Sequence, residues 1–356
     1  MRKLYEKVNK TLNTLTFNDI WNGFAKTDFA LYDKNNVFLK DGVIPYDNRF
    51  LGNTTIDYEG ENLAIWLIEN IEDIDYKELS ANIVHEMFHS FQISQNESRF
   101  PDDIKALSYP SDLENYQLKY NENIMLVNAL NSKEKNKKID ILSQIVTSRK
   151  LRLNKFGSLI KYEFIIETIE GSAEYCGTKA LKSISNNLYQ NRLEKYKEIL
   201  LSDKKMLFDI RRCCYFWGTL FLLLLDEIGI DFPKEIHGQY LTIFEQIIPL
   251  MKCNTIINQI KSEKIDKYFE EETFRKEKLI DDFNSNNPLI YDGEFSICGY
   301  DPMNMFKIDN KIFCSNFILL YNTITKENTF ISGPVILILE NDSDIIKRYY
   351  AINRGV

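Results

Sequence analysis

The segment Ile83–Phe91, IVHEMFHSF, contains two of the three histidines of the chain, and these two stand four residues apart. Its apolar residues recur at helical spacing, and residues four apart lie on one face of a helix. His85 and His89 can therefore offer their imidazoles to one metal ion. The segment thus requires a helix, in a fold that brings a further metal ligand to the histidine face.

This helix is expected to cover about residues 76–95. Asp75, with Glu78 three residues later, is typical of a helix start. Glu86 lies between the two histidines in sequence and is expected to face the same cleft, where a carboxylate can take a proton from water at a metal ion. The alternative is an ordinary helix on which two histidines flank a glutamate and bind nothing.

A catalytic zinc ion takes three protein ligands and keeps a fourth position open. The remaining histidine, His237, lies in PKEIHGQY, which resembles an exposed helix, so a carboxylate is expected as the third ligand. The best source is FIIETIEGSAEYCG, on a helix expected at about 160–184. Its small residues would let another helix approach closely. An inward-facing acidic stripe requires a cation. Four glutamates form one such stripe on this helix: Glu163, Glu167, Glu170 and Glu174.

His85-Glu86-x-x-His89 followed by EGSAEY resembles the gluzincin metallopeptidases, and the resemblance extends over roughly 54–229. It implies one Zn²⁺ per chain, held by His85, His89 and Glu170, with Glu86 as the general base. It also implies that Glu174 orients a zinc-bound histidine, as carboxylates behind metal ligands do. Two other glutamates remain alternative third ligands: Glu122, in NENIML, and Glu167.

The segment RCCYFWGTLFLLLLDEIG, residues 212–229, continues the resemblance. Gluzincin aminopeptidases and related families carry a tyrosine three residues before a glycine at the head of an apolar helix, where it stabilises the oxyanion. Tyr215 and Gly218 match this spacing. A tyrosine at the head of a buried helix also needs a partner for its hydroxyl. The alternatives are a plain core tyrosine at this position, and His237 as the oxyanion donor.

The sequence predicts an α+β fold. A mainly helical, zincin-like catalytic domain is expected at 1–283, with a small N-terminal sheet whose strands lie at about 54–68 around a Glu-Gly turn. The segment 284–293, NSNNPLIYDG, is rich in turn-forming residues and is expected to be a linker. The strand-like segments beyond it predict a small β-rich region at 294–356.

The net charge is 44 − 52 = −8, which argues against nucleic acid and anionic lipid surfaces as partners. The longest apolar run, 216–225, is about half the length of a membrane span, and the first residues contain no secretory signal. Six cysteines without a CxxC pair favour free thiols in a reducing compartment. A cytoplasmic location is therefore expected, while the oligomeric state is not indicated.

The expected function is zinc-dependent hydrolysis of a peptide or protein substrate. The aminopeptidase-type GxMEN segment is absent before His85, which favours an endopeptidase. Two other classes stay open. One is a non-catalytic zinc-binding or toxin-like interaction module that retains a zincin fold, and the other is a hydrolase of non-peptide amides. Peptide deformylases are excluded from the latter, because no cysteine ligand precedes Cys176.

Overall fold

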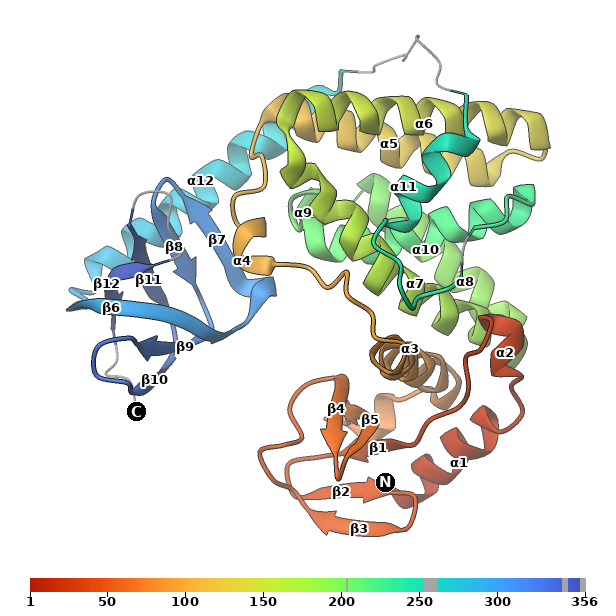
Figure 1. Cartoon of the computed structure of the whole chain (residues 1–356), viewed down its shortest axis with the longest axis horizontal. Coiled ribbons are helices and arrows are strands. Elements are labelled where there is room, and N and C mark those ends of the chain that lie inside the picture. The colour runs from red at the N-terminus through yellow and green to blue at the C-terminus, as the bar shows by residue number, and fades with distance from the viewer. Residues whose placement is uncertain (203, 233, 253–260, 341–344, 353–356) are drawn as a thin grey trace. The chain divides into compact units, whose positions relative to one another are not determined.

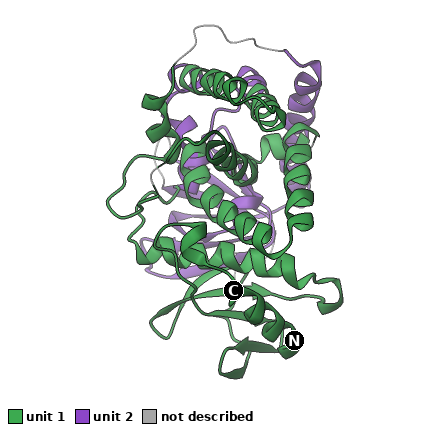
Figure 2. Ribbon diagram, turned by 90° about the vertical axis from the view of Figure 1, so that its right-hand side faces the viewer, with its two compact units in different colours: residues 1–101, 119–151, 163–258 green, residues 102–118, 152–162, 259–356 purple. Residues whose placement is uncertain are grey.

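The computed structural model describes residues 1–202, 204–232, 234–252, 261–340 and 345–352. It combines helices with two β-sheets, which confirms the predicted α+β class. The chain divides into two compact units, coloured separately in Figure 2. Unit 1 contains residues 1–101, 119–151 and 163–258, and unit 2 contains 102–118, 152–162 and 259–356.

Helices form most of the described chain (Figure 1). Twelve α-helices are α1 (Arg2–Leu12), α2 (Phe17–Ile20), α3 (Tyr76–Ser94), α4 (Asp103–Ala106), α5 (Leu113–Asn131), α6 (Lys135–Phe156), α7 (Lys161–Ile184), α8 (Asn186–Ser202), α9 (Lys204–Phe208), α10 (Ile210–Ile228), α11 (Ile243–Ile247) and α12 (Glu263–Ser285). Four short 3₁₀ helices accompany them: η1 (Ile71–Asp73), η2 (Ser158–Ile160), η3 (Ile248–Leu250) and η4 (Pro302–Asn304). The predicted helices at 76–95 and 160–184 are confirmed as α3 and α7.

Unit 1 contains a five-stranded sheet in the order β3-β2-β1-β5-β4. Its strands are β1 (Phe29–Tyr32), β2 (Asn36–Leu39), β3 (Gly42–Pro45), β4 (Thr54–Tyr58) and β5 (Glu61–Leu67). β1 and β5 are parallel, and the other pairs are antiparallel. The predicted strands at 54–68 are β4 and β5. The turn between them places Glu59 at φ 56° and Gly60 at φ 87°, left-handed values that suit a two-residue hairpin loop.

Unit 2 contains a seven-stranded antiparallel sheet in the order β10-β9-β6-β12-β11-β8-β7. Its strands are β6 (Leu289–Tyr300), β7 (Met305–Ile308), β8 (Lys311–Cys314), β9 (Phe317–Asn322), β10 (Asn328–Ser332), β11 (Val335–Leu339) and β12 (Ile346–Ala351). Alternate residues of β11 serve two different cores. Val335 and Leu337 belong to the core formed by other strands of the sheet. Ile336, on the opposite face, packs with Ile280 and Phe283 of α12.

The predicted linker at 284–293 is wrong. Its first residues end α12, and its last residues lie in β6, so only 286–288 connect the two elements. The predicted boundary at 283 is wrong for the same reason, because Ile280 and Phe283 belong to the core of the C-terminal sheet. The apolar face of α12 packs against the sheet and extends the helix to Ser285, into the turn-forming residues of this segment. The predicted β-rich region beyond 294 is confirmed.

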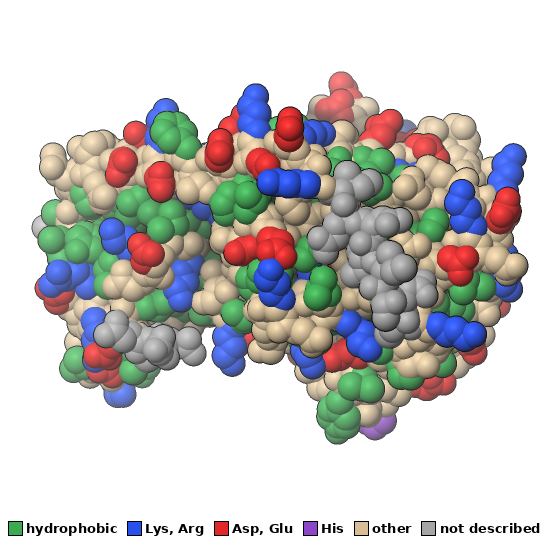
Figure 3. All heavy atoms as spheres, turned by 90° about the horizontal axis from the view of Figure 1, so that it is seen from above, with side chains coloured by type: hydrophobic (Ala, Val, Ile, Leu, Met, Phe, Trp, Pro, Cys, Tyr) green, Lys and Arg blue, Asp and Glu red, His purple; other side chains and the backbone are tan. Residues whose placement is uncertain are grey.

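The surface carries charges of both signs. Over the face seen in Figure 3, Lys and Arg side chains are interspersed with Asp and Glu side chains. In the part of the chain that the structure describes, no helix is long and apolar enough to cross a membrane. The apolar run 216–225 lies inside α10, where most of its side chains are buried.

Candidate metal centre

The helix that carries the HExxH segment is fixed at its start and along one side. The Asp75 carboxylate accepts hydrogen bonds from the backbone N–H groups of Lys77 at 2.7 Å and Glu78 at 3.4 Å, which caps α3. On the sheet side, Thr55 of β4 donates its hydroxyl to the carbonyl of Glu86 at 2.6 Å. The edge strand of the sheet therefore contacts α3 at the glutamate between the two histidines.

Glycines let α7 approach two other helices. A Cβ added at Gly177 would lie 2.6 Å from the carbonyl oxygen of Ala81 in α3. A Cβ at Gly171 would lie 2.8 Å from the Cα of Gly218 in α10. Real Cβ atoms do not approach other atoms so closely, so only glycine permits these crossings. The prediction that small residues of this helix allow a close approach is confirmed, and α3, α7 and α10 meet around one centre.

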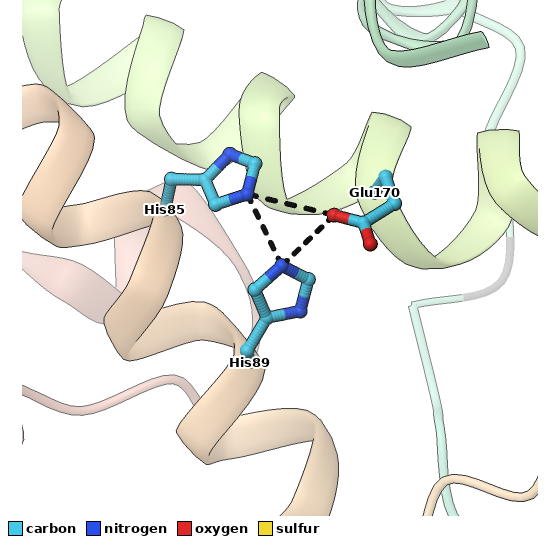
Figure 4. A group of neighbouring side chains, drawn as sticks. All are labelled: His85, His89 and Glu170. Atoms are coloured by element: carbon cyan, nitrogen blue, oxygen red, sulfur yellow. Dashed lines mark hydrogen bonds and ion pairs between the residues drawn. The ribbon is translucent and has the colours of Figure 1, made fainter. Parts of the chain in front are cut away.

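His85, His89 and Glu170 converge at this centre (Figure 4). The two imidazoles project from α3 toward the Glu170 carboxylate on α7. The Nε2 atoms of the two histidines are 3.1 Å apart. Glu170 Oε2 lies 3.1 Å from His89 Nε2 and 3.7 Å from His85 Nε2. The three atoms thus form a triangle with two sides of 3.1 Å and one of 3.7 Å, largely shielded from solvent.

His85 is held from behind by the predicted residue. Its Nδ1 lies 2.9 Å from Glu174 Oε2, and a carboxylate can only accept, so Nδ1 carries a hydrogen. Glu174 is itself bound by two residues of α8 that the sequence did not reveal. Tyr196 donates to its Oε1, as does Arg192 at 3.3 Å. No local spacing signals these two residues, because they come from a different helix.

His89 has a different partner, Gln92, whose Oε1 lies 2.7 Å from His89 Nδ1. Gln92 was not predicted as a site residue. The sequence does contain a signal for it, because residues three apart on a helix are neighbours. Both Nδ1 atoms are therefore occupied by contacts on the outside of the centre, and both Nε2 atoms face inward.

Glu170 is also bound through its second oxygen. Arg211, at the start of α10, donates to Glu170 Oε1 at 2.8 Å. Tyr215, one helical turn later, stacks its ring on His85 with centroids 6.0 Å apart. Burial, the charge of Glu170 and a hydrogen bond to that carboxylate raise the pKa of Tyr215, so its hydroxyl remains a donor at neutral pH. The structure therefore brings Tyr215 to the centre, together with an arginine that was not predicted.

The side chains by themselves balance their charges. Burial lowers the pKa of His85, but Glu170 and Glu174 outweigh it and raise the pKa to about 10. At His89, burial again lowers the pKa, but the charge of Glu170 and its hydrogen bond outweigh burial, and the pKa of His89 is raised. Burial raises the pKa of Glu170, but the charge of His89 and hydrogen bonds from both histidines hold it well below its usual range. Positive imidazoles and negative carboxylates therefore stabilise one another here.

Glu86 differs from the other carboxylates of the centre. It is 6% exposed, and within the described ranges its carboxylate accepts no hydrogen bond from the protein. Burial raises its pKa, and this effect outweighs the opposing charges of His85 and His89. A buried carboxylate with a raised pKa and no partner is a better proton acceptor than an ion-paired one.

The two alternative third ligands are engaged elsewhere. Arg149 forms two parallel hydrogen bonds with Glu167, each 2.6 Å long, and its Nε lies 3.3 Å from Glu122. Glu163, the first residue of the acidic stripe, pairs with Lys119 at 2.6 Å. The stripe does face inward, and each of its carboxylates has a cationic partner among the side chains of the protein itself.

A second group of potential metal ligands combines Glu163, Glu167 and Cys214. Lys119 and Arg149 already neutralise its two carboxylates, so the group needs no metal ion. His237 is not part of either group. It lies in an exposed turn, not on the predicted helix, with its Nδ1 3.3 Å from the carbonyl of Gln95.

The triangle fits a tetrahedral metal ion. Bonds of about 2.0–2.1 Å to a central zinc ion place neighbouring ligand atoms about 3.3–3.4 Å apart. The observed separations of 3.1, 3.1 and 3.7 Å bracket this value. Comparisons of the chain with known protein families, curated proteins and solved structures find no match.

Proposed function

We propose that this protein is a zinc-dependent metallopeptidase of the gluzincin type, in which His85, His89 and Glu170 hold the zinc ion. The observation that supports the proposal most is the triangle of Nε2, Nε2 and Oε2 atoms. Once both Nε2 atoms are deprotonated, each of the three atoms offers a lone pair toward the same point, where a cation can replace the protons. Two nitrogens and one carboxylate oxygen are a donor set that zinc accepts.

The proposed chemistry is hydrolysis of a peptide bond. When bound, zinc supplies polarisation of the scissile carbonyl and lowers the pKa of water. Glu86 takes the proton of the attacking water and passes it to the leaving amine. Its raised pKa suits this role, because a protein base works best when its pKa approaches the working pH.

Tyr215 and Arg211 provide hydrogen-bond donors on the α10 side of the centre. The Tyr215 hydroxyl stays protonated and can donate to the negative oxygen that develops on the scissile carbonyl. Arg211 holds Glu170 Oε1 at 2.8 Å, so that Oε2 is the oxygen directed at the histidines. Arg211 therefore favours binding of the metal through a single oxygen of Glu170.

The edge strand β4 suits an extended peptide substrate. The N–H of Ala64 in β5 donates to the carbonyl of Asp28, on the β1 side. Neighbouring residues of a strand point their backbone groups to opposite edges, so Leu63 faces its partner Ile56 in β4. The backbone of Asp57, the next residue in β4, then points to the free edge. A substrate strand could pair there, beside the strand that contacts Glu86.

The test is the metal content of purified protein, measured for the wild type and for Glu170→Ala. The expected result is about one zinc ion per wild-type chain and a sharp loss in the variant. Glu122→Ala is the matched control, because Glu122 is also buried but pairs with Arg149. A folded wild type that binds no zinc would overturn the proposal. Zinc without hydrolysis of any peptide in a broad library would favour the non-catalytic binding module.

A further inference from the structure

We infer that Gln92 is a positioning residue, which determines the nitrogen of His89 that faces the metal. Its amide also binds α7, the helix that carries Glu170. This inference rests on the proposed function. Gln92 is 1% exposed and lies between α3 and α7. Its amide contacts the His89 ring of α3, and the carbonyl of Ile169 and the hydroxyl of Ser172 in α7.

The orientation of the Gln92 amide follows from its partners. Its nitrogen lies 2.9 Å from the carbonyl oxygen of Ile169, which can only accept a hydrogen bond. The same nitrogen lies 3.2 Å from the hydroxyl of Ser172, which donates its own hydrogen to the carbonyl of Thr168 at 2.6 Å. Two acceptors therefore face one end of the amide. That end must be the NH₂ group, and the oxygen must face His89.

This orientation determines which ring nitrogen of His89 carries a hydrogen toward Gln92. An amide oxygen can only accept, so the His89 Nδ1 at 2.7 Å must carry a hydrogen. His89 Nε2 is then the nitrogen available inside the centre, 3.1 Å from Glu170 Oε2. Because Ile169 directly precedes Glu170, one side chain holds both the histidine ring and the backbone beside the third ligand. Rotation of the ring and sliding of α7 past α3 would each break a bond to Gln92.

The use of an amide also limits the charge of the centre. The partner of His85 is a carboxylate, Glu174, and Glu86 and Glu170 add two more. A fourth carboxylate at position 92 would face the carbonyl of Ile169 and repel it. Glutamine supplies the acceptor that His89 needs and a donor for α7, without a further negative charge.

The experiment uses the ¹⁵N-labelled full chain, treated with a chelator, and follows the imidazole Nδ1–H signals by NMR. The chain has only three histidines, so their signals can be assigned with His→Gln variants. A protected Nδ1–H signal from His89 is expected in the wild type and absent in Gln92→Leu. Gln92→Glu keeps the acceptor and is expected to retain the signal. Gln95→Leu, one turn later on the same chain segment, is the control and should match the wild type.

Zinc affinity is the second readout. Gln92→Leu is expected to bind zinc about 10- to 100-fold more weakly, as for other residues behind metal ligands, and Gln92→Glu to lie between it and the wild type. An unchanged His89 signal or an unchanged zinc affinity in folded Gln92→Leu would overturn the inference. If that variant does not fold, Gln92→Met gives the same test. A wild type with the signal but without zinc affinity refutes the proposed function and leaves the link between Gln92 and His89 standing.

Discussion

Gly171 of α7 and Gly218 of α10 pack so closely that a Cβ on Gly171 would lie 2.8 Å from the Gly218 Cα. This contact determines how near α10 comes to the proposed metal centre. Gly171 directly follows Glu170, and Gly218 lies three residues after Tyr215. Both helices therefore present their proposed functional residues at the point where they touch.

Gly171→Ala should force α7 and α10 apart. We expect a loss of about 1–3 kcal/mol in the free energy of unfolding, as for other overpacked sites, and weaker zinc binding. Chemical denaturation and zinc titration measure the two effects. Gly42→Ala is the control, because nothing lies within 4 Å of a Cβ placed there. Equal stability of the two variants would show that the crossing tolerates a methyl group.

Glu86→Gln should separate catalysis from metal binding. The amide cannot accept the proton of the attacking water, so we expect peptide hydrolysis to fall by about 10²- to 10⁴-fold. Zinc content should not change, because Glu86 is not among the three converging ligands. The measurement is turnover of a peptide library beside metal analysis of the same preparation. Undiminished turnover in the variant would remove Glu86 from the proposed mechanism.

The pKa of His85 predicts how chelator-treated protein responds to pH. Because the folded-state pKa, about 10, lies above the ordinary value of 6.5, protonated His85 stabilises the fold. This contribution is complete below about pH 6.5 and disappears as the pH rises toward 10. Wild type should therefore exceed His85→Gln in melting temperature by more at pH 6 than at pH 10. A melting-temperature difference that grows as the pH rises would contradict the stabilising role of protonated His85. His237→Gln is the control for loss of an exposed histidine.

The free edge of β4 can be tested with Asp57→Pro. Proline removes an N–H that faces outward, so the pairing of β4 with β5 should survive. Asp57 also accepts a hydrogen bond from the N–H of Gly60, and Asp57→Ala loses this bond while keeping the edge N–H. We expect a higher KM for peptides in the proline variant than in the alanine variant, with equal zinc content. Equal KM values would exclude substrate pairing at this edge.

Glu167→Gln should affect stability and leave the metal site intact. Arg149 and Glu167 are almost completely buried and share two hydrogen bonds, so the change leaves a buried guanidinium without its main partner. Breaking such a pair costs about 3–5 kcal/mol of unfolding free energy. The folded fraction should still bind one zinc ion. Loss of zinc at unchanged stability would instead restore Glu167 as a candidate ligand.

Local spacing alone determined several features of this protein. The four-residue interval between His85 and His89 places both rings on one face of any helix, and Asp75 marks where that helix begins. The spacing of the glutamates on α7 likewise gives one stripe, whatever the rest of the chain does. Such inferences succeed because they depend on helix geometry, which is the same in every environment.

The tertiary structure decided which members of that stripe meet the histidines. Glu163 and Glu167 face Lys119 and Arg149, which are distant in sequence, whereas Glu170 faces the imidazoles. The residues that hold the ligands also come from other helices, as Arg211 does from α10. A carboxylate binds whichever cation packing brings to it, and packing depends on contacts between elements far apart in the chain. For that reason, the sequence could indicate the candidate ligands, but only the fold could distinguish Glu170 from its neighbours.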